Sequence, residues 1–152
     1  MKTIEHQNRK YTFLGDIQAS TFLMYLVDES NPEDYKLIYQ KLFDKNQFCM
    51  IVVAIHDWQG ELSPWAAPAI FEKHDFAGNA SLLLSELERF WDWFQSDNQV
   101  ETDRLYLCGY SLAGLFALWS SCQTNLFKKV AAVSPSVWYK GFVEYLDQSK
   151  IF

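Results

Sequence analysis

One short stretch constrains the fold of this chain more than any other: LYLCGYSLAGLFALW, residues 105–119. An apolar run typical of a strand leads into Gly109-Tyr110-Ser111, and apolar spacing typical of a helix follows at once. A strand passes into a helix with almost no loop only on a sharp, strained turn. The stretch therefore predicts that the Ser111 hydroxyl is held above the edge of a sheet, as a nucleophile would be.

The residues around the serine fit such a turn, because strand and helix cross closely there and need small side chains. Gly109 lies two positions before Ser111, and Ala113 lies two positions after it, where glycine is commoner. Gly114 comes next and relieves the crowding. The pattern alone is weak, and its place between an apolar strand and an apolar helix strengthens it. The alternative is an ordinary tight turn in which Ser111 caps the helix.

Strand-like and helix-like segments alternate four times along the chain, which predicts right-handed crossovers and a three-layer α/β/α sandwich with a mainly parallel sheet. A helix-start signal, Asn31-Pro32 with Glu33 and Asp34, precedes the first helix, and a loop with Gly60, Pro64 and Pro68 follows the second strand. We expect strands at 17–28, 48–56, 103–108 and 129–134, with helices at 31–44, from 79, at 112–123 and in a short tail. Ligands of such sheets bind at the carboxyl ends of the strands, where Ser111 lies.

Composition limits the domain organisation, partners and location that the chain can have. Hydrophobic residues make up 49% of the 152 residues and charged residues 21%, as expected for one globular domain spanning 1–152. A net charge of -6 without a Lys/Arg cluster argues against a nucleic-acid partner. Because no apolar stretch is long enough to cross a bilayer and the N-terminus lacks an apolar signal core, we expect a soluble cytoplasmic protein with no membrane partner.

The cysteines indicate a reducing compartment. Cys49, Cys108 and Cys122 are odd in number and lie in apolar segments, so we expect buried thiols without disulfides. Their spacing has no metal-ligand pattern, and no glycine-rich phosphate loop follows a predicted strand. We expect neither a metal nor another cofactor, and a nucleotide-binding domain is a distant third interpretation.

Two backbone groups are candidates to stabilise an oxyanion formed by attack of the serine. A helix that starts at Leu112 points its N–H groups and positive dipole end at whatever Ser111 attacks. The second donor is expected from the loop after the first parallel strand, around Val27 and Asp28.

A serine nucleophile needs a general base, normally a histidine. The three histidines all precede Ser111. His56, next to Asp57, ends a predicted strand and could lie at the edge of the sheet that holds Ser111; the alternative is an ordinary solvated residue at a strand end. His74 is expected on a surface loop, and His6 lies in a polar N-terminal segment that indicates nothing.

Four stretches of the sequence together resemble a known family. GYSLAGLFALW, AAVSPSVWY, DWQGELSPWAAPAIF and DFAGNA are similar to segments of the esterase branch of the α/β-hydrolase superfamily, the esterase D-like proteins. The resemblance runs from about residue 17 to the end. It implies Ser111 as nucleophile, Leu112 and Asp28 as backbone oxyanion donors, and substrate contacts from Tyr110, Trp58, Trp65 and Trp138.

Plainer interpretations stay open for several of these residues. The tryptophans near strand ends fit core packing as well as substrate contact. Ser134 and Ser136 are expected to be turn or cap residues.

In α/β-hydrolases the acid and the histidine follow the serine along the chain, but here no histidine does. The resemblance thus implies an α/β-hydrolase fold that lacks its C-terminal strands. It would leave the strand at 129–134 as an exposed edge that could pair with a second copy of the chain. Two hypotheses follow: a serine-dependent carboxylic-ester hydrolase for small-molecule esters, of low activity in this chain alone, or a non-catalytic binding module.

Overall fold

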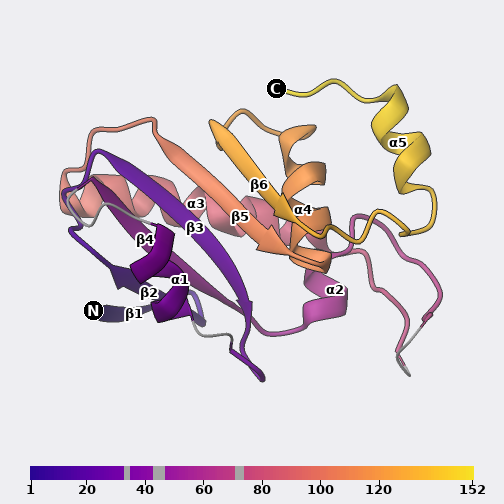
Figure 1. The fold of residues 1–152 in the computed structure, drawn as a ribbon, viewed down its shortest axis with the longest axis horizontal. Coiled ribbons are helices and arrows are strands. Elements are labelled where there is room, and N and C mark those ends of the chain that lie inside the picture. Colours follow the sequence, from indigo (N-terminus) through magenta and orange to yellow (C-terminus); the bar gives the residue numbers. More distant parts are fainter. Residues whose placement is uncertain (33–34, 43–46, 71–73) are drawn as a thin grey trace.

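The computed structural model describes residues 1–32, 35–42, 47–70 and 74–152, and its centre is a six-stranded sheet of order β1-β2-β4-β3-β5-β6 (Figure 1). The strands are β1 Lys2–His6, β2 Arg9–Leu14, β3 Thr21–Asp28, β4 Phe48–Ile55, β5 Leu105–Tyr110 and β6 Lys129–Val133. The helices are α1 Tyr35–Leu42, α2 Trp58–Leu62, α3 Ala80–Asn98, α4 Leu112–Ser121 and α5 Phe142–Gln148.

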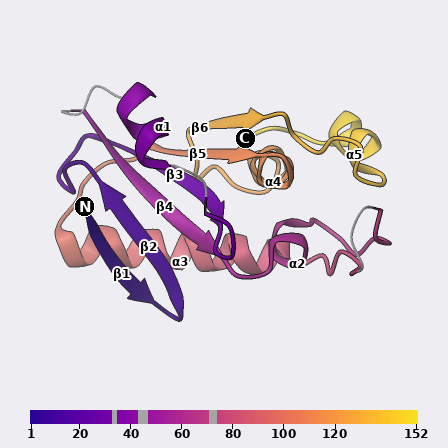
Figure 2. The same cartoon turned by 60° about the horizontal axis from the view of Figure 1, so that its bottom comes forward.

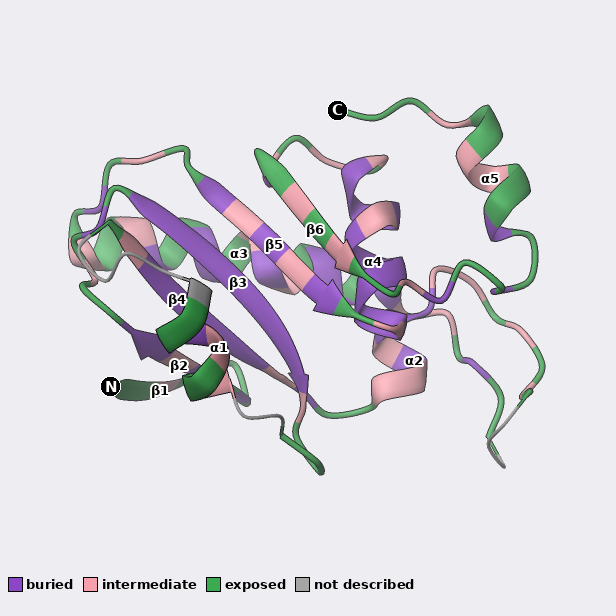
Figure 3. Ribbon diagram, in the orientation of Figure 1, coloured by how far each residue is buried: buried purple, intermediate pink, exposed green. Residues whose placement is uncertain are grey.

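The predicted mainly parallel sheet is confirmed. β4, β3, β5 and β6 run parallel, and β3 is buried along nearly its whole length because it lies in the middle of them (Figure 3). The predicted strand 17–28 is wrong in its first four residues, since β3 starts at Thr21. Those residues form a turn in which the Asp16 carboxylate accepts the Gln18 N–H at 2.8 Å.

An N-terminal hairpin that the sequence analysis did not predict adds two antiparallel strands. β1 pairs with β2, and β2 pairs with β4. Gln7 and Asn8 form the two-residue turn with φ of 49° and 67°. Positive φ at both positions is typical of the hairpin turn whose twist matches that of the strands.

The helices largely follow the predicted pattern, with one exception. α3 buries the predicted apolar stripe and ends at Asn98; the next residue, Gln99, caps it in a left-handed conformation with φ 54°. α2 lies where a loop was predicted, and the Asp57 carboxylate caps it by accepting the Gly60 N–H at 3.1 Å. Of the first helix, predicted at 31–44, residues 31 and 32 are not helical, and residues 33–34 and 43–44 lie outside the described residues.

Helices cover both faces of the sheet unequally. α3 and α4 pack on one face through the large core cluster, and α1 packs on the other over β3 and β4 (Figure 2). On the side of α1, the β5 and β6 side chains Tyr110 and Val133 are 48% and 49% exposed. Cys49 is buried as predicted, whereas Cys108 is only partly buried because α1 covers β5 incompletely, and Cys122 is partly buried at the end of α4.

Candidate active site

Ser111 occupies the sharp connection between β5 and α4, with φ 58° and ψ -117°. Few residues other than glycine adopt positive φ, so the backbone is strained at this serine. Three backbone hydrogen bonds hold it there. The Ser111 N–H donates to the Val133 carbonyl at 3.0 Å, and the Ser111 carbonyl accepts the N–H groups of Leu115 and Ser136, each at 3.1 Å.

The turn is possible because β5 and α4 cross almost in contact. A Cβ atom on Gly109 would lie 2.2 Å from the Ala113 carbonyl oxygen and 2.9 Å from the Ala113 Cβ. One on Gly114 would lie 3.1 Å from the nearest atoms, the Gly109 oxygen and the Pro135 Cα. Glycine is therefore required at 109, whereas position 114 is tight but less restrictive.

A cavity of about 140 Å³ opens beside Ser111. Figure 1 shows the edge of the sheet where β5 and β6 end, near the start of α4. The lining of the cavity comes from four segments: Trp58, Gln59, Phe76, Ser111, Leu112, Ser136 and Trp138. The structure thus brings together four of the residues singled out from the sequence: Ser111, Leu112, Trp58 and Trp138. None of the described lining residues is titratable near neutral pH.

Three other residues singled out from the sequence are not among the described residues that line this cavity. Tyr110 points to the opposite face of the sheet, with Cys108. The Trp65 indole N–H donates to the Lys140 carbonyl at 2.8 Å, and its ring packs against Phe142. The Asp28 carboxylate accepts the Ser30 N–H at 2.9 Å at the end of β3.

Ser136 is a site residue that the sequence analysis missed. Its Oγ lies 3.3 Å from the Ser111 Oγ, and the residue is only 2% exposed. The sequence analysis assigned it to a turn, which its backbone does form. The signal available was that Ser134-Pro135-Ser136 directly follows β6, whose carboxyl end lies at the same edge of the sheet as that of β5, the strand before Ser111.

His56 does not reach Ser111. Its Nδ1 lies 2.5 Å from the Glu29 Oε2, and its Nε2 lies 2.9 Å from the Asn8 carbonyl oxygen. The hydrogen bond to Glu29 raises the pKa of His56 above its ordinary value. β3 lies between β4, which His56 follows, and β5, which leads to Ser111, and the His56 ring contacts the turn of the N-terminal hairpin instead. The hypothesis that His56 is the base for Ser111 is therefore wrong.

The other two histidines are also not among the described residues that line the Ser111 cavity. His6 stacks on Trp93 with ring centroids 4.5 Å apart, and His74 is exposed in a loop. In the part of the chain that the structure describes, no three His, Cys, Asp or Glu side chains are grouped to hold a metal. None of the described helices is long and apolar enough to cross a bilayer.

A buried charge cluster anchors α2, which carries Trp58 and Gln59 to the cavity. Arg9 is 2% exposed, and its guanidinium pairs with Glu61 of α2 and Glu86 of α3 and donates to the Ala54 carbonyl at 2.6 Å. Burial alone would lower the pKa of Arg9, but the hydrogen bonds to both carboxylates raise it above its ordinary value. Arg9 therefore remains charged and ties α2 to β2.

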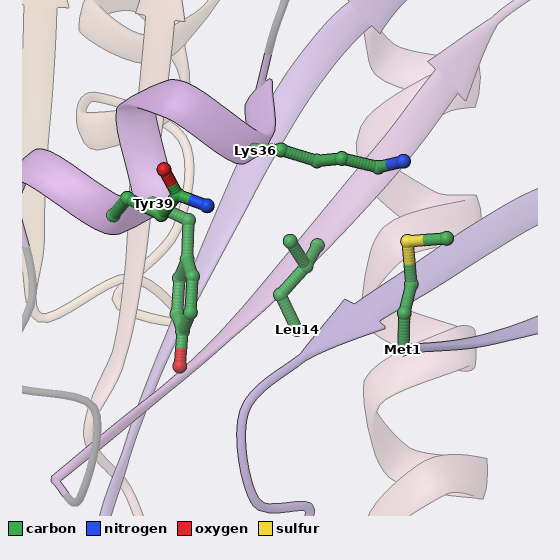
Figure 4. A pocket seen from close by; sticks show the side chains of 5 residues that line it. Met1, Leu14, Lys36 and Tyr39 are labelled. Carbon is green, nitrogen blue, oxygen red and sulfur yellow. The ribbon is translucent and has the colours of Figure 1, made fainter.

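A second cavity, of about 310 Å³, lies between α1 and the N-terminal hairpin (Figure 4). Met1, Leu14, Lys36, Tyr39 and Gln40 line it. The described lining contains no serine, cysteine or histidine that could act as a nucleophile or base. The cavity beside Ser111 is the candidate active site because it is lined by the serine of the strained turn.

The fold is a mainly parallel sheet with helices on both faces, and Ser111 lies on the sharp turn between one of its strands and the next helix. No protein-family model matches the sequence, and no curated protein matches it.

Solved structures do match the fold. An IroE-like serine hydrolase from Shewanella oneidensis superposes with a TM-score of 0.76 at 18% identity, over 97% of this chain and 54% of the other. The BES protein from Bacillus cereus superposes with a TM-score of 0.70 at 16% identity, over 97% of this chain and 67% of the other. The siderophore hydrolase EstA from Aspergillus nidulans superposes with a TM-score of 0.63 at 19% identity, over 93% of this chain and 58% of the other. At these identities the likeness shows the fold, and the chain spans about half to two thirds of these structures.

Proposed function

We propose that this chain carries the nucleophile and part of the pocket of a serine-dependent carboxylic-ester hydrolase, with Ser111 on a nucleophile elbow. The observation that carries the proposal is the backbone of Ser111, at φ 58° and ψ -117°, strained beside a cavity. Structural strain of this kind is typical of functional sites. The names of two matching structures, a serine hydrolase and a siderophore hydrolase, support the same class.

The proposed reaction is acyl transfer in two steps. The Ser111 Oγ forms a bond to the acyl carbon, the bond from that carbon to the alcohol oxygen breaks, and the serine proton ends on the departing alcohol. Water then attacks the acyl-serine ester, releasing the carboxylic acid and returning the proton to Ser111. The balance requires no cofactor.

The oxyanion formed in each step would be held by backbone N–H groups. Leu112 lines the cavity and occupies the first position of α4, where the N–H has no acceptor within the helix. Asp28 is the proposed second donor. β3 and β5 pair at Tyr25 and Cys108, and three residues further along both strands brings Asp28 level with Ser111.

The cavity walls favour an apolar acyl group. Trp58, Phe76 and Trp138 supply the apolar surface against which it would pack. Trp65 and Tyr110 lie outside this cavity, so a contact from either requires a substrate that extends beyond it.

Low turnover is part of the proposal, because no described residue that lines the cavity can act as a general base. Hydrolases that lose a triad member retain roughly a thousandfold acceleration over water from the oxyanion hole and binding. We expect activity of that order from this chain alone.

The second candidate is a binding module without catalysis. The observation that favours it is the same set of lining residues, which offers tryptophan rings and hydroxyls but no titratable group. A module of this kind would bind a small molecule at the Ser111 cavity and leave it unchanged.

A fluorophosphonate probe separates the two candidates, since a serine poised for attack displaces the fluoride and keeps the phosphonyl group. We expect slow labelling that maps to Ser111 by peptide mass and is absent in Ser111→Ala. Hydrolysis of p-nitrophenyl acetate should fall to background in the same variant. Labelling at another residue, or hydrolysis unchanged by Ser111→Ala, would overturn the assignment, and no labelling would favour the binding module.

A further inference from the structure

We infer that Ser136 is a positioning residue for the nucleophile: its buried hydroxyl orients the Ser111 Oγ and donates a hydrogen bond to it during attack. The inference rests on the proposed function, since it assigns a role only if Ser111 reacts. It goes beyond that function because it adds a second hydroxyl, from the loop after β6, to the reacting atoms.

The backbone fixes the two serines relative to each other. The Ser136 N–H donates to the Ser111 carbonyl at 3.1 Å, and the Ser111 N–H donates to the Val133 carbonyl at 3.0 Å. One hydrogen bond thus joins the turn at Ser111 to the end of β6, and the other joins it to the loop after β6. Within this frame the two Oγ atoms lie 3.3 Å apart, and both side chains line the same cavity.

Ser111 needs such a partner because its backbone places the Cβ but not the Oγ. A serine side chain has three staggered rotamers, and only some direct the oxygen at a substrate in the cavity. Ser136 is 2% exposed, so water cannot freely replace Ser111 as the partner of its hydroxyl. The shared hydrogen bond selects the rotamer in which the two oxygens face each other.

The contact also has a chemical consequence. At 3.3 Å it is longer than an optimal O–H···O hydrogen bond, so it orients Ser111 weakly at rest. As Oγ gains negative charge on losing its proton, a bond donated by the Ser136 hydroxyl shortens and strengthens. Donation in this sense leaves the Ser111 proton free to reach the base or the leaving alcohol.

Ser136→Ala tests the inference cleanly, because it removes the hydroxyl and leaves the backbone hydrogen bonds in place. Ser120→Ala is the matched control. Ser120 is fully buried in α4, and its hydroxyl donates only to the Ala117 carbonyl, at 2.8 Å. Ser136→Thr keeps the hydroxyl and serves as the conservative variant.

The measurement is the rate of fluorophosphonate labelling at Ser111 as a function of pH, with urea unfolding of each variant alongside. We expect Ser136→Ala to label about five- to tenfold more slowly, the value of one neutral hydrogen bond. Its rate profile should also shift to higher pH, because the Ser111 alkoxide loses a donor. Ser120→Ala should match the wild type, and Ser136→Thr should recover most of the rate.

The outcomes separate the inference from the function on which it rests. Wild-type labelling at Ser111 with an equal rate and pH profile in Ser136→Ala overturns the role of Ser136 and leaves Ser111 as the nucleophile. A folded Ser136→Thr as slow as Ser136→Ala also overturns it. A wild-type chain that the probe does not label overturns the proposed function, and the role of Ser136 with it.

Discussion

At the scale of single residues, Gly109 decides whether the turn at Ser111 can form. We expect Gly109→Ala to destabilise the chain by about 2 kcal/mol, because the new methyl would meet the Ala113 carbonyl oxygen and force α4 away from β5. Labelling of Ser111 should be lost under conditions where the variant is still folded. Urea unfolding and probe labelling measure the two effects.

Gly114→Ala is the matched control for that prediction. Its methyl would lie 3.1 Å from the nearest atoms, compared with 2.2 Å for a methyl at position 109. Alanine also stabilises a helix by about 1 kcal/mol relative to glycine. We expect both the stability and the labelling of Gly114→Ala to stay near those of the wild type. Equal losses in the two variants would show that the close crossing at 109 is not what shapes the turn.

His56 and Glu29 form a residue pair whose contribution depends on pH. The hydrogen bond with Glu29 raises the pKa of His56 above 6.5. The stability that His56 adds to the folded state is therefore present below pH 6.5 and is lost as the pH rises through the raised pKa. The same bond lowers the pKa of Glu29 below 4.5, so its contribution is present above 4.5 and is lost as pH falls through the lowered value.

We therefore expect His56→Gln to lower the urea midpoint most at about pH 5.5 and hardly at all at about pH 9. Unfolding curves of both proteins across that range test it. A difference that stays constant from acid to alkaline pH would mean that packing of the ring, and not the charge pair, stabilises this corner of the molecule.

At the scale of elements, the Arg9 cluster joins the hairpin to α2 and α3. Removing the cation leaves Glu61 and Glu86 without the only positive partner that the described residues give them, so we expect Arg9→Met to destabilise the chain by about 3 kcal/mol. Lys10→Met, at an exposed position of the same strand, should change it by less than about 0.5 kcal/mol. Urea unfolding at neutral pH measures both.

The triple variant Arg9→Met, Glu61→Gln, Glu86→Gln should recover part of the stability lost in Arg9→Met, because no uncompensated carboxylate remains. A triple variant less stable than Arg9→Met would contradict the electrostatic explanation and point to lost packing of the arginine stem.

The elements best predicted from the sequence are those whose signal is local. α3 follows from its apolar spacing, and β4 follows from its run of apolar β-branched residues. The hairpin was missed because its turn is Gln7-Asn8 and lacks the usual glycine. α2 was missed because a glycine normally indicates a loop, whereas Gly60 leaves room for the Asp57 carboxylate that caps the helix. Local signals identify elements but do not show which cap or turn will form.

The same distinction holds for the candidate site. Ser111 was predicted because strand, serine and helix are consecutive in the sequence, and the strained backbone is a local property. Ser136 was missed and His56 was misplaced because their partners depend on the strand order, which puts β6 beside β5 and β3 between β4 and β5. The position of β3 between β4 and β5 does not follow from the order of the strands along the chain, whereas β5 and β6 are consecutive and their pairing could have been expected.

At the scale of the whole molecule, β6 pairs only with β5 among the described residues, and its outer edge is open (Figure 3). Antiparallel pairing of two copies about Ala131 would set Lys129 of one opposite Val133 of the other and bring no like charges together. We propose that two copies of the chain could pair through β6 in this self-complementary register.

Two substitutions at one position test the register. Val133 is 49% exposed, so either a lysine or a glutamate fits there in the monomer. We expect Val133→Lys to weaken a dimer by facing Lys129 of the second copy, and Val133→Glu to strengthen it. Light scattering after size-exclusion chromatography, over a range of protein concentrations, measures both. Equal masses for the two variants at every concentration would rule out this pairing.

The two indole rings beside Ser111 give the cavity its own optical signal. Trp58 and Trp138 come from elements on either side of the turn, and both border the cavity. A molecule that enters displaces water from their rings, so tryptophan emission should move to shorter wavelength on occupancy. Binding and acylation at this cavity can therefore be followed in the unlabelled protein, even where turnover is too slow to detect a product.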